Sequence, residues 1–246
     1  MPMSSPVLEL SGISKAYGGL RPLRMRALSV TTGEVVALAG FDQTTAEVFV
    51  NLATGATLPE EGTVRVFGRA TADIADSADW LATVDRFGIV SERVVLLEQF
   101  TPLQNIAMSL TLDVDPLPVD VRRQAEALAR EAGVDDTAFD RAVGDSRVAL
   151  RHRVRLARAM ATSPAMLLIE HPIAGLAAHE IAPLAADITR VAATRGVAVI
   201  VLAADASTAT PFAHRVLTLN GGTGELTETR RTGLLGKLKN AITGTG

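Results

Sequence analysis

Cysteine is absent from all 246 residues. This absence excludes disulfides and thiolate zinc sites, and it fits a reducing compartment. Neither sign of charge dominates, because the formal net charge is only −3, and a value so near neutral does not support nucleic-acid binding as the main function. The first residues, MPMSSPVLEL, have no positively charged region followed by a long apolar core, so we expect no signal peptide.

No apolar run is long enough for a transmembrane helix. The nearest candidate, AMLLIEHPIAGLAA (165–178), is interrupted by Glu170, His171 and Pro172. Hydrophobic residues make up 48% of the chain, and a chain of this length buries roughly three quarters of its unfolded surface on folding. We therefore expect a soluble protein with a full core.

Apolar segments alternate with helical stretches. The predicted strands are 7–10, 35–39, 63–67, 165–169, 197–202 and 214–219. The predicted helices are 119–134, about 146–162 and about 179–195. The strand–helix–strand alternation in the second half of the chain predicts a parallel sheet that is buried on both faces.

The stretch VVALAGFDQTTAEVFVNLATG (35–55) predicts a strand, a turn and a helix. This is the layout of a phosphate-binding loop, in which amides at a helix N-terminus hold phosphate oxygens. The loop nevertheless has no second glycine, no lysine and no Ser or Thr at the position of the magnesium ligand. The stretch therefore keeps the frame of a nucleotide site without the groups that bind the nucleotide.

The order of these segments resembles the ATP-binding subunit of an ABC transporter over nearly the whole chain. The matching segments are LELSGISKAYGG (8–19), TTGEVVALAG (31–40), GTVRVFGR (62–69), FGIVSERVVLLEQFTPLQNIAMSL (87–110) and RVRLARAMATSPAMLLIEHPIAGL (153–176). The last segment is the most specific, because it resembles the helix after the signature motif, the Walker B strand and the D-loop in the family's order. The layout is closest to the lipoprotein-release, MacB-like and FtsE-like branch.

The resemblance implies an α/β protein with the ABC-type P-loop NTPase fold. In that fold a RecA-like parallel sheet core carries an antiparallel β subdomain and a helical subdomain. We expect one nucleotide-binding domain over 1–246. Its expected parts are the core in 7–100 and 160–230, the helical subdomain in 101–158 and a C-terminal tail in 231–246. Tyr17 falls at the family's adenine-stacking position.

The family's Walker A loop reads Gly-x-x-Gly-x-Gly-Lys-Ser-Thr, and GFDQTTAEV (40–48) aligns with it. The aligned positions are Gly40 for the first glycine, Gln43 and Thr45 for the later glycines, Ala46 for the lysine, Glu47 for the magnesium hydroxyl and Val48 as the last remnant position. Two interpretations of Glu47 are open. Its carboxylate lies at the helix N-terminus where phosphate would bind, or it is an ordinary first-turn helix residue.

The other stations of the family's site are changed as well. They are Glu92 at the Q-loop glutamine, Ser146, Arg147, Val148, Ala149 and Leu150 at the signature Leu-Ser-Gly-Gly-Gln, Glu170 and His171 at the Asp-Glu of Walker B, Ala177 at the D-loop aspartate and Ala204 at the switch histidine. Glu170 imitates the aspartate with a longer arm. His171 is either a base for the attacking water or a satisfied polar residue at a strand end.

Phosphoryl transfer is catalysed mostly by positioning and charge neutralisation, and the changed residues are those that supply both. The main prediction is therefore a pseudo-ATPase, that is, a non-enzyme with no catalytic residue, no metal, no cofactor and at most weak binding of ATP and magnesium. The rival prediction is a divergent, active ABC ATPase that uses Glu170 and His171 to hydrolyse ATP and drive transport. A sensor for some other ligand is a third alternative, with no motif in its favour.

The resemblance also implies partners, namely membrane permease subunits and a second nucleotide-binding subunit, at the cytoplasmic face of the cell membrane. No nucleic-acid partner is expected. The permease groove would be lined by residues around 93–102, and the alternative is that these residues are ordinary core. They are Arg93 and the apolar Val94, Val95, Leu96, Leu97 and Phe100. The segment 232–243 predicts a short basic amphipathic helix, which contacts a membrane or a partner or packs on its own domain.

Overall fold

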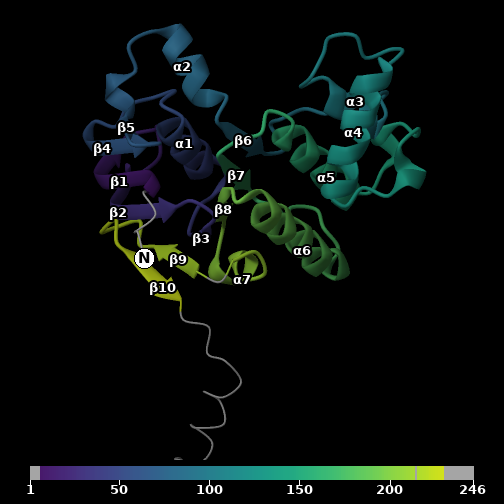
Figure 1. Ribbon diagram of the computed structural model, residues 1–246. Coiled ribbons are helices and arrows are strands. Elements are labelled where there is room, and N and C mark those ends of the chain that lie inside the picture. Colours follow the sequence, from purple (N-terminus) through teal and green to yellow (C-terminus); the bar gives the residue numbers. More distant parts are fainter. Residues whose placement is uncertain (1–5, 214, 230–246) are drawn as a thin grey trace, which may run out of the picture.

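The computed structural model describes residues 6–213 and 215–229. Two sheets form its framework (Figure 1), a four-stranded sheet in the order β2-β1-β4-β5 and a six-stranded sheet in the order β10-β9-β3-β8-β7-β6. The predicted tail 231–246, including the helix expected at 232–243, lies outside the described residues.

The four-stranded sheet is antiparallel. Its strands are β1 (Pro6–Lys15), β2 (Leu23–Thr31), β4 (Glu61–Val66) and β5 (Arg69–Ala70). Leu10 of β1 pairs with Leu28 of β2 on one side and with Val64 of β4 on the other. All of these side chains are buried, so one face of the sheet turns toward the core.

The six-stranded sheet supplies the parallel core. Its strands are β3 (Val35–Ala39), β6 (Phe87–Val90), β7 (Met166–Glu170), β8 (Ala198–Ala203), β9 (Arg215–Leu219) and β10 (Leu226–Thr229). β10 runs antiparallel to β9, and the other described pairs are parallel. Every residue of β7 and β8 is buried, which confirms the predicted parallel sheet with both faces covered.

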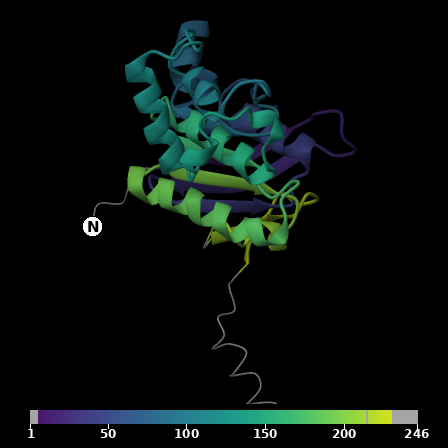
Figure 2. The same ribbon diagram turned by 90° about the vertical axis from the view of Figure 1, so that its right-hand side faces the viewer.

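Helices cover the two faces of this sheet. α1 (Gln43–Ala53) packs with Leu168 and Ile200 and with apolar residues of the antiparallel sheet. α6 (Ala178–Arg195) packs with Leu167 and Val199 on the opposite face, and Figure 2 shows it lying along the sheet. The carboxyl ends of the parallel strands therefore open beside the N-terminus of α1.

The remaining helices lie at the ends of the molecule. α3 (Pro102–Ala107), α4 (Val119–Glu131) and α5 (Val148–Met160) gather at one end, whereas α2 (Ser77–Val84) lies beyond the antiparallel sheet (Figure 1). The short helix α7 (Ala206–Ala209) follows β8. Short 3-10 turns lie at Thr71–Asp73, Asp136–Ala138 and Val143–Asp145.

The predicted elements are all present, with shifted ends. The helix predicted at 146–162 begins at Val148 and ends at Met160, and the one predicted at 119–134 ends at Glu131. The elements that were not predicted are β2, β5, β6, β10, α2, α3 and α7. Within residues 6–213 and 215–229, no helix has both the length and the apolar character needed to cross a membrane.

Candidate functional site

Two pockets lie where β3, β7 and β8 end, which is the usual position of ligand sites in parallel sheets. We call them the narrow and the wide part of one cleft because both are lined by Thr44. Its narrow part has a volume of about 400 Å³ and is lined by Gln43, Thr44, Glu47, Ser91, Glu92, Arg93, Glu170 and His171. Its wide part, of about 1030 Å³, is lined among others by Tyr17, Gly40, Asp42, Thr44 and Ala204. Thr44 borders both parts, so the N-terminal turn of α1 lies between them.

The backbone conformation at position 40 requires a glycine. Its φ of 92° is in the left-handed region, and a Cβ at this position would lie 3.0 Å from the carbonyl oxygen of Leu219. The retained first glycine of the loop is therefore explained by chain conformation and close packing. Its presence alone gives no information about phosphate binding.

Asp42 caps α1. Its carboxylate accepts hydrogen bonds from the backbone amide of Thr45 at 2.8 Å and from the Thr45 hydroxyl at 2.7 Å. The bond from the Thr45 amide lowers the pKa of Asp42 below its usual value. A carboxylate thus already lies at the N-terminus of α1, where a phosphate group would otherwise accept the hydrogen bond from the Thr45 amide.

The position of Asp42 corrects both interpretations of Glu47. α1 begins at Gln43 and has no acidic residue in its first turn, so Glu47 is neither at the helix N-terminus nor a first-turn residue. Its side chain is half-exposed and lines the narrow part of the cleft instead. The alignment misplaced the helix start because it took the Walker A loop as the frame.

Ala46 and Val48 are also corrected. Ala46 is fully buried in the core between α1 and the two sheets, and Val48 packs against the same core. Neither residue lines the cleft. The position aligned with the phosphate-binding lysine therefore points into the protein, because the helix starts earlier than the family's loop implies.

Arg93 joins two carboxylates across the narrow part of the cleft. Its Nη1 lies 3.2 Å from Glu47, its Nε donates to Glu170 at 3.2 Å, and its Nη2 also donates to Glu170. The bond to Glu170 raises the pKa of Arg93 above its usual value. Ser91 donates a further hydrogen bond of 2.8 Å to Glu170. The carboxylate of the buried Glu170 is thus held by hydrogen bonds from Ser91 and Arg93, which follow β6.

His171 follows β7 directly and lines the same narrow space. Its φ of 45° is unusual for a residue other than glycine. Its amide donates to the Leu202 carbonyl at 2.9 Å, which fixes the backbone. Its side-chain Nε2 is buried and has no hydrogen-bond partner among the described residues. This geometry contradicts the interpretation of His171 as a polar residue whose hydrogen bonds are satisfied.

Glu92, aligned with the Q-loop glutamine, lines the same narrow part of the cleft, and its side chain is exposed.

Tyr17 lies in the wide part of the cleft, in the loop between β1 and β2. The side chain is half-buried and packs against the core. A Cβ at Gly19 would come within 2.7 Å of the Tyr17 ring, so the glycine lets the loop fold against the aromatic side chain. The loop therefore presents an aromatic ring to the wide cleft.

The signature and D-loop positions lie away from this cleft. Ser146 and Arg147 precede α5, and Val148, Ala149 and Leu150 are its first residues. Ala177 is the exposed residue before α6. The structure therefore brings together Tyr17, Gly40, Glu47, Glu92, Glu170, His171 and Ala204, and it leaves the signature segment and Ala177 outside.

Only some of the residues predicted to line the permease groove are exposed at the surface. Leu96 is buried in the core, so it is not available for docking, and Arg93 is engaged with Glu47 and Glu170. Leu97 and Phe100 are half-buried. Val95, also predicted to line this groove, is 68% exposed.

Sequence reasoning missed the functional contacts of Asp42, Ser91 and Arg93. For Asp42 a signal was present, since an Asp three residues before Thr45 is a helix N-cap pattern. For Arg93 no local signal exists, because its partner Glu170 lies 77 residues further along the chain. Such a contact is visible only after the strands are placed side by side.

Curated proteins resemble the chain along most of its length. It is 32% identical over 201 residues to the phosphonates import ATP-binding protein PhnC of Anaeromyxobacter dehalogenans, covering 79% of this chain but 40% of that protein. It is 32% identical over 178 residues to the lipoprotein-releasing system ATP-binding protein LolD of Maricaulis maris, covering 71% of this chain and 77% of that protein. No protein-family model matches the chain.

Solved structures share its fold. The ATP-binding cassette MJ0796, in a dimeric post-hydrolysis state bound to ADP and Pi, gives a TM-score of 0.73 at 21% identity, covering 92% of this chain and 100% of that one. CbiO1 from Clostridium perfringens, part of the ABC transporter complex cbiONQ, gives a TM-score of 0.77 at 16% identity, covering 91% and 88%. The predicted ABC-type fold is confirmed.

These comparisons overturn one prediction. The chain was expected to be a non-enzyme, and this is wrong, because its relatives are named as ATP-binding proteins of import and release systems, a family that hydrolyses ATP. The expected absence of a cofactor also finds no support among relatives that are named for ATP. The chain belongs to the family of ABC transporter ATP-binding proteins.

Proposed function

We propose that the chain is a divergent ABC ATPase whose hydrolysis of ATP drives transport through membrane permease subunits. Membership of the family supports this proposal, as does the cleft at the carboxyl ends of the parallel strands. The observation that carries it is His171, which lines the narrow part of the cleft and whose buried Nε2 has no hydrogen-bond partner among the residues that the structure describes.

His171 is suited to act as the base of this reaction. A residue held at a positive φ stores backbone strain, and such residues cluster at functional sites. Imidazole is the commonest general base in enzymes. In the proposed step a water oxygen bonds to the γ-phosphorus while the bond to the bridging oxygen breaks. Nε2 of His171 takes the water proton, and ADP and phosphate leave.

The wide part of the cleft is suited to the purine. Tyr17 presents its ring there. An aromatic ring can stack on any nucleotide base, since every base has a flat π-face. The triphosphate would then extend past Thr44, which borders both parts, toward His171. In this arrangement the base lies at Tyr17 and the γ-phosphate lies beside His171.

The partners proposed are permease subunits and a second nucleotide-binding subunit, with the chain peripheral to the membrane. For the permease, Val95, Leu97 and Phe100 form the apolar surface beside the cleft. For the second subunit, the segment Ser146–Leu150 and Ala177 lie outside the cleft of their own chain. Arg147 and Ala177 are exposed, so we propose that they face the cleft of a partner, whereas Ala149 is buried in its own chain.

Phosphate release from ATP by the purified chain tests the proposal, with His171→Ala as the variant. Removal of a general base typically lowers the rate by about 10²–10⁴-fold, so we expect slow release by the wild type and a loss of at least roughly a hundredfold in the variant. Thermal unfolding of the variant is the control for its fold. Release no faster than that of heat-denatured protein, or release unchanged in a folded His171→Ala chain, would contradict the proposal.

A further inference from the structure

The narrow part of the cleft is lined by a positively charged side chain, that of Arg93. The guanidinium of Arg93 contacts Glu47 on α1 and Glu170 at the end of β7. Glu47 and Glu170 stand at the positions aligned with the two magnesium-binding residues of the family. The structure thus places a fixed positive charge between the two groups that a divalent metal would need.

The residues present do not fit a magnesium ion. Magnesium is bound in proteins through one or two carboxylates together with waters and phosphate oxygens. Here the Glu170 oxygens accept hydrogen bonds from Arg93 and from Ser91, and the Glu47 carboxylate is paired with Arg93. A metal would have to displace a guanidinium of the same sign of charge.

We propose that Arg93 takes the place of the divalent cation, so that this site binds no metal and meets the phosphates of the ligand with a guanidinium. Arginine forms a rigid fork of five N–H donors that matches phosphate oxygens. Its contacts with Glu47 and Glu170 leave further N–H donors, and the side chain is 44% exposed. The part of this inference that concerns nucleotide rests on the proposed function.

Titration with Mn²⁺ alone tests the metal part without any nucleotide. The free-ion paramagnetic signal is followed as Mn²⁺ is added to the wild-type chain, to Arg93→Ala and to the charge-retaining Arg93→Lys. We expect no binding by the wild type or by Arg93→Lys. We expect at least roughly tenfold tighter binding by Arg93→Ala, whose Glu47 and Glu170 become available.

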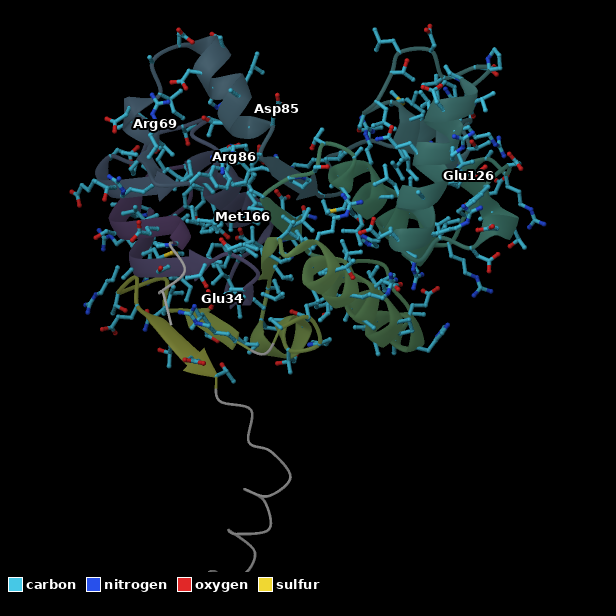
Figure 3. The ribbon with its side chains drawn as sticks, viewed as in Figure 1. Glu34, Arg69, Asp85, Arg86, Glu126 and Met166 are labelled. Carbon is cyan, nitrogen blue, oxygen red and sulfur yellow. The ribbon has the colours of Figure 1, made fainter. Side chains whose placement is uncertain are left out.

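A matched control is Arg122→Ala. Arg122 also contacts two carboxylates, those of Glu126 and Asp140, at 3.0 Å each, and Figure 3 shows Glu126 on α4, far from Met166 on β7. This control should gain no Mn²⁺ binding. Tight binding of Mn²⁺ by the wild type, or a gain in Arg122→Ala equal to that in Arg93→Ala, would overturn the inference.

A calorimetric titration of the wild type with ATP, in Mg²⁺ and in EDTA, needs no variant. The inference expects the two dissociation constants to agree within roughly threefold, whereas a loss of roughly tenfold or more in EDTA would overturn it and leave the proposed function intact. No heat from ATP in either buffer would reject the proposed function. The Mn²⁺ titration would still decide the role of Arg93.

Discussion

The carboxylate of Asp42 accepts two hydrogen bonds from Thr45, one from its backbone amide at 2.8 Å and one from its hydroxyl at 2.7 Å. It therefore engages the Thr45 N–H, one of the groups with which the N-terminus of α1 would bind a phosphate. Replacement of Asp42 by Ala should destabilise the protein by about 1 kcal/mol through loss of the cap. It should also raise the affinity for inorganic phosphate, because an anion at that terminus is removed.

Urea unfolding and a phosphate titration of Asp42→Ala measure the two effects. Asp42→Asn is the matched control, since asparagine still caps the helix but carries no charge. Unchanged phosphate affinity in both variants would show that the carboxylate does not compete with phosphate.

Tyr17 should contribute to nucleotide affinity by stacking. Alanine substitution of a base-stacking aromatic costs about 1–3 kcal/mol per base, so Tyr17→Ala should weaken ATP binding accordingly, whereas Tyr17→Phe should retain it. Calorimetry with ATP and with inorganic triphosphate separates the base from the phosphates. Equal losses for both ligands in Tyr17→Ala would argue against stacking.

Restoring the family's residues in the loop should damage the protein. Ala46 is fully buried in the core, so Ala46→Lys places an ammonium group there without a partner, which costs several kcal/mol. Glu47→Ser, at a half-exposed side chain, should change the stability by no more than about 0.5 kcal/mol. Urea unfolding of the two single variants compares them directly. An Ala46→Lys chain as stable as the wild type would contradict the helix start at Gln43.

Stability should fall on mild acidification because of His152. The ring is buried, with Nε2 3.5 Å from the Ala174 carbonyl, and burial lowers the pKa of His152 below its usual 6.5. The unfolded chain therefore takes up the proton at a higher pH than the folded chain does. The contribution of the neutral ring is complete above pH 6.5 and is lost as the pH falls from 6.5 toward the folded pKa, by at most about 1.4 kcal/mol per pH unit.

Urea unfolding between pH 7.5 and 5.0 checks this slope, with His152→Gln as the comparison. Asp42 and Glu34, whose pKa values are lowered from 3.8 and 4.5, titrate below this window. A slope that persists in His152→Gln would assign the effect to other groups.

The parallel sheet could be predicted from the sequence because its strands are continuous apolar runs. β3, β7 and β8 were all predicted, since strands buried on both faces leave no polar positions to obscure them. His171 was selected from the resemblance to the Walker B segment, and the structure places it directly after β7, where it lines the narrow part of the cleft. The sequence thus led to residues that the structure places in pockets at this edge of the sheet, and their function stays a proposal.

The contacts inside the site could not be predicted in the same way. The place where α1 begins is decided by one side-chain hydrogen bond from Asp42, and an alignment to the family's loop shifted it. That shift moved Ala46 from the cleft into the core and Glu47 away from the helix N-terminus. The contacts of Arg93 join elements that are distant in sequence, so only the tertiary structure shows them.

The most direct test of the account is whether the purified chain binds ATP. Calorimetric titration with ATP should give a micromolar dissociation constant, about −8 kcal/mol, since we propose that the cleft holds the purine at Tyr17 and the phosphates near Arg93 and His171. No heat up to millimolar ATP, an affinity of about −4 kcal/mol or weaker, would contradict the account.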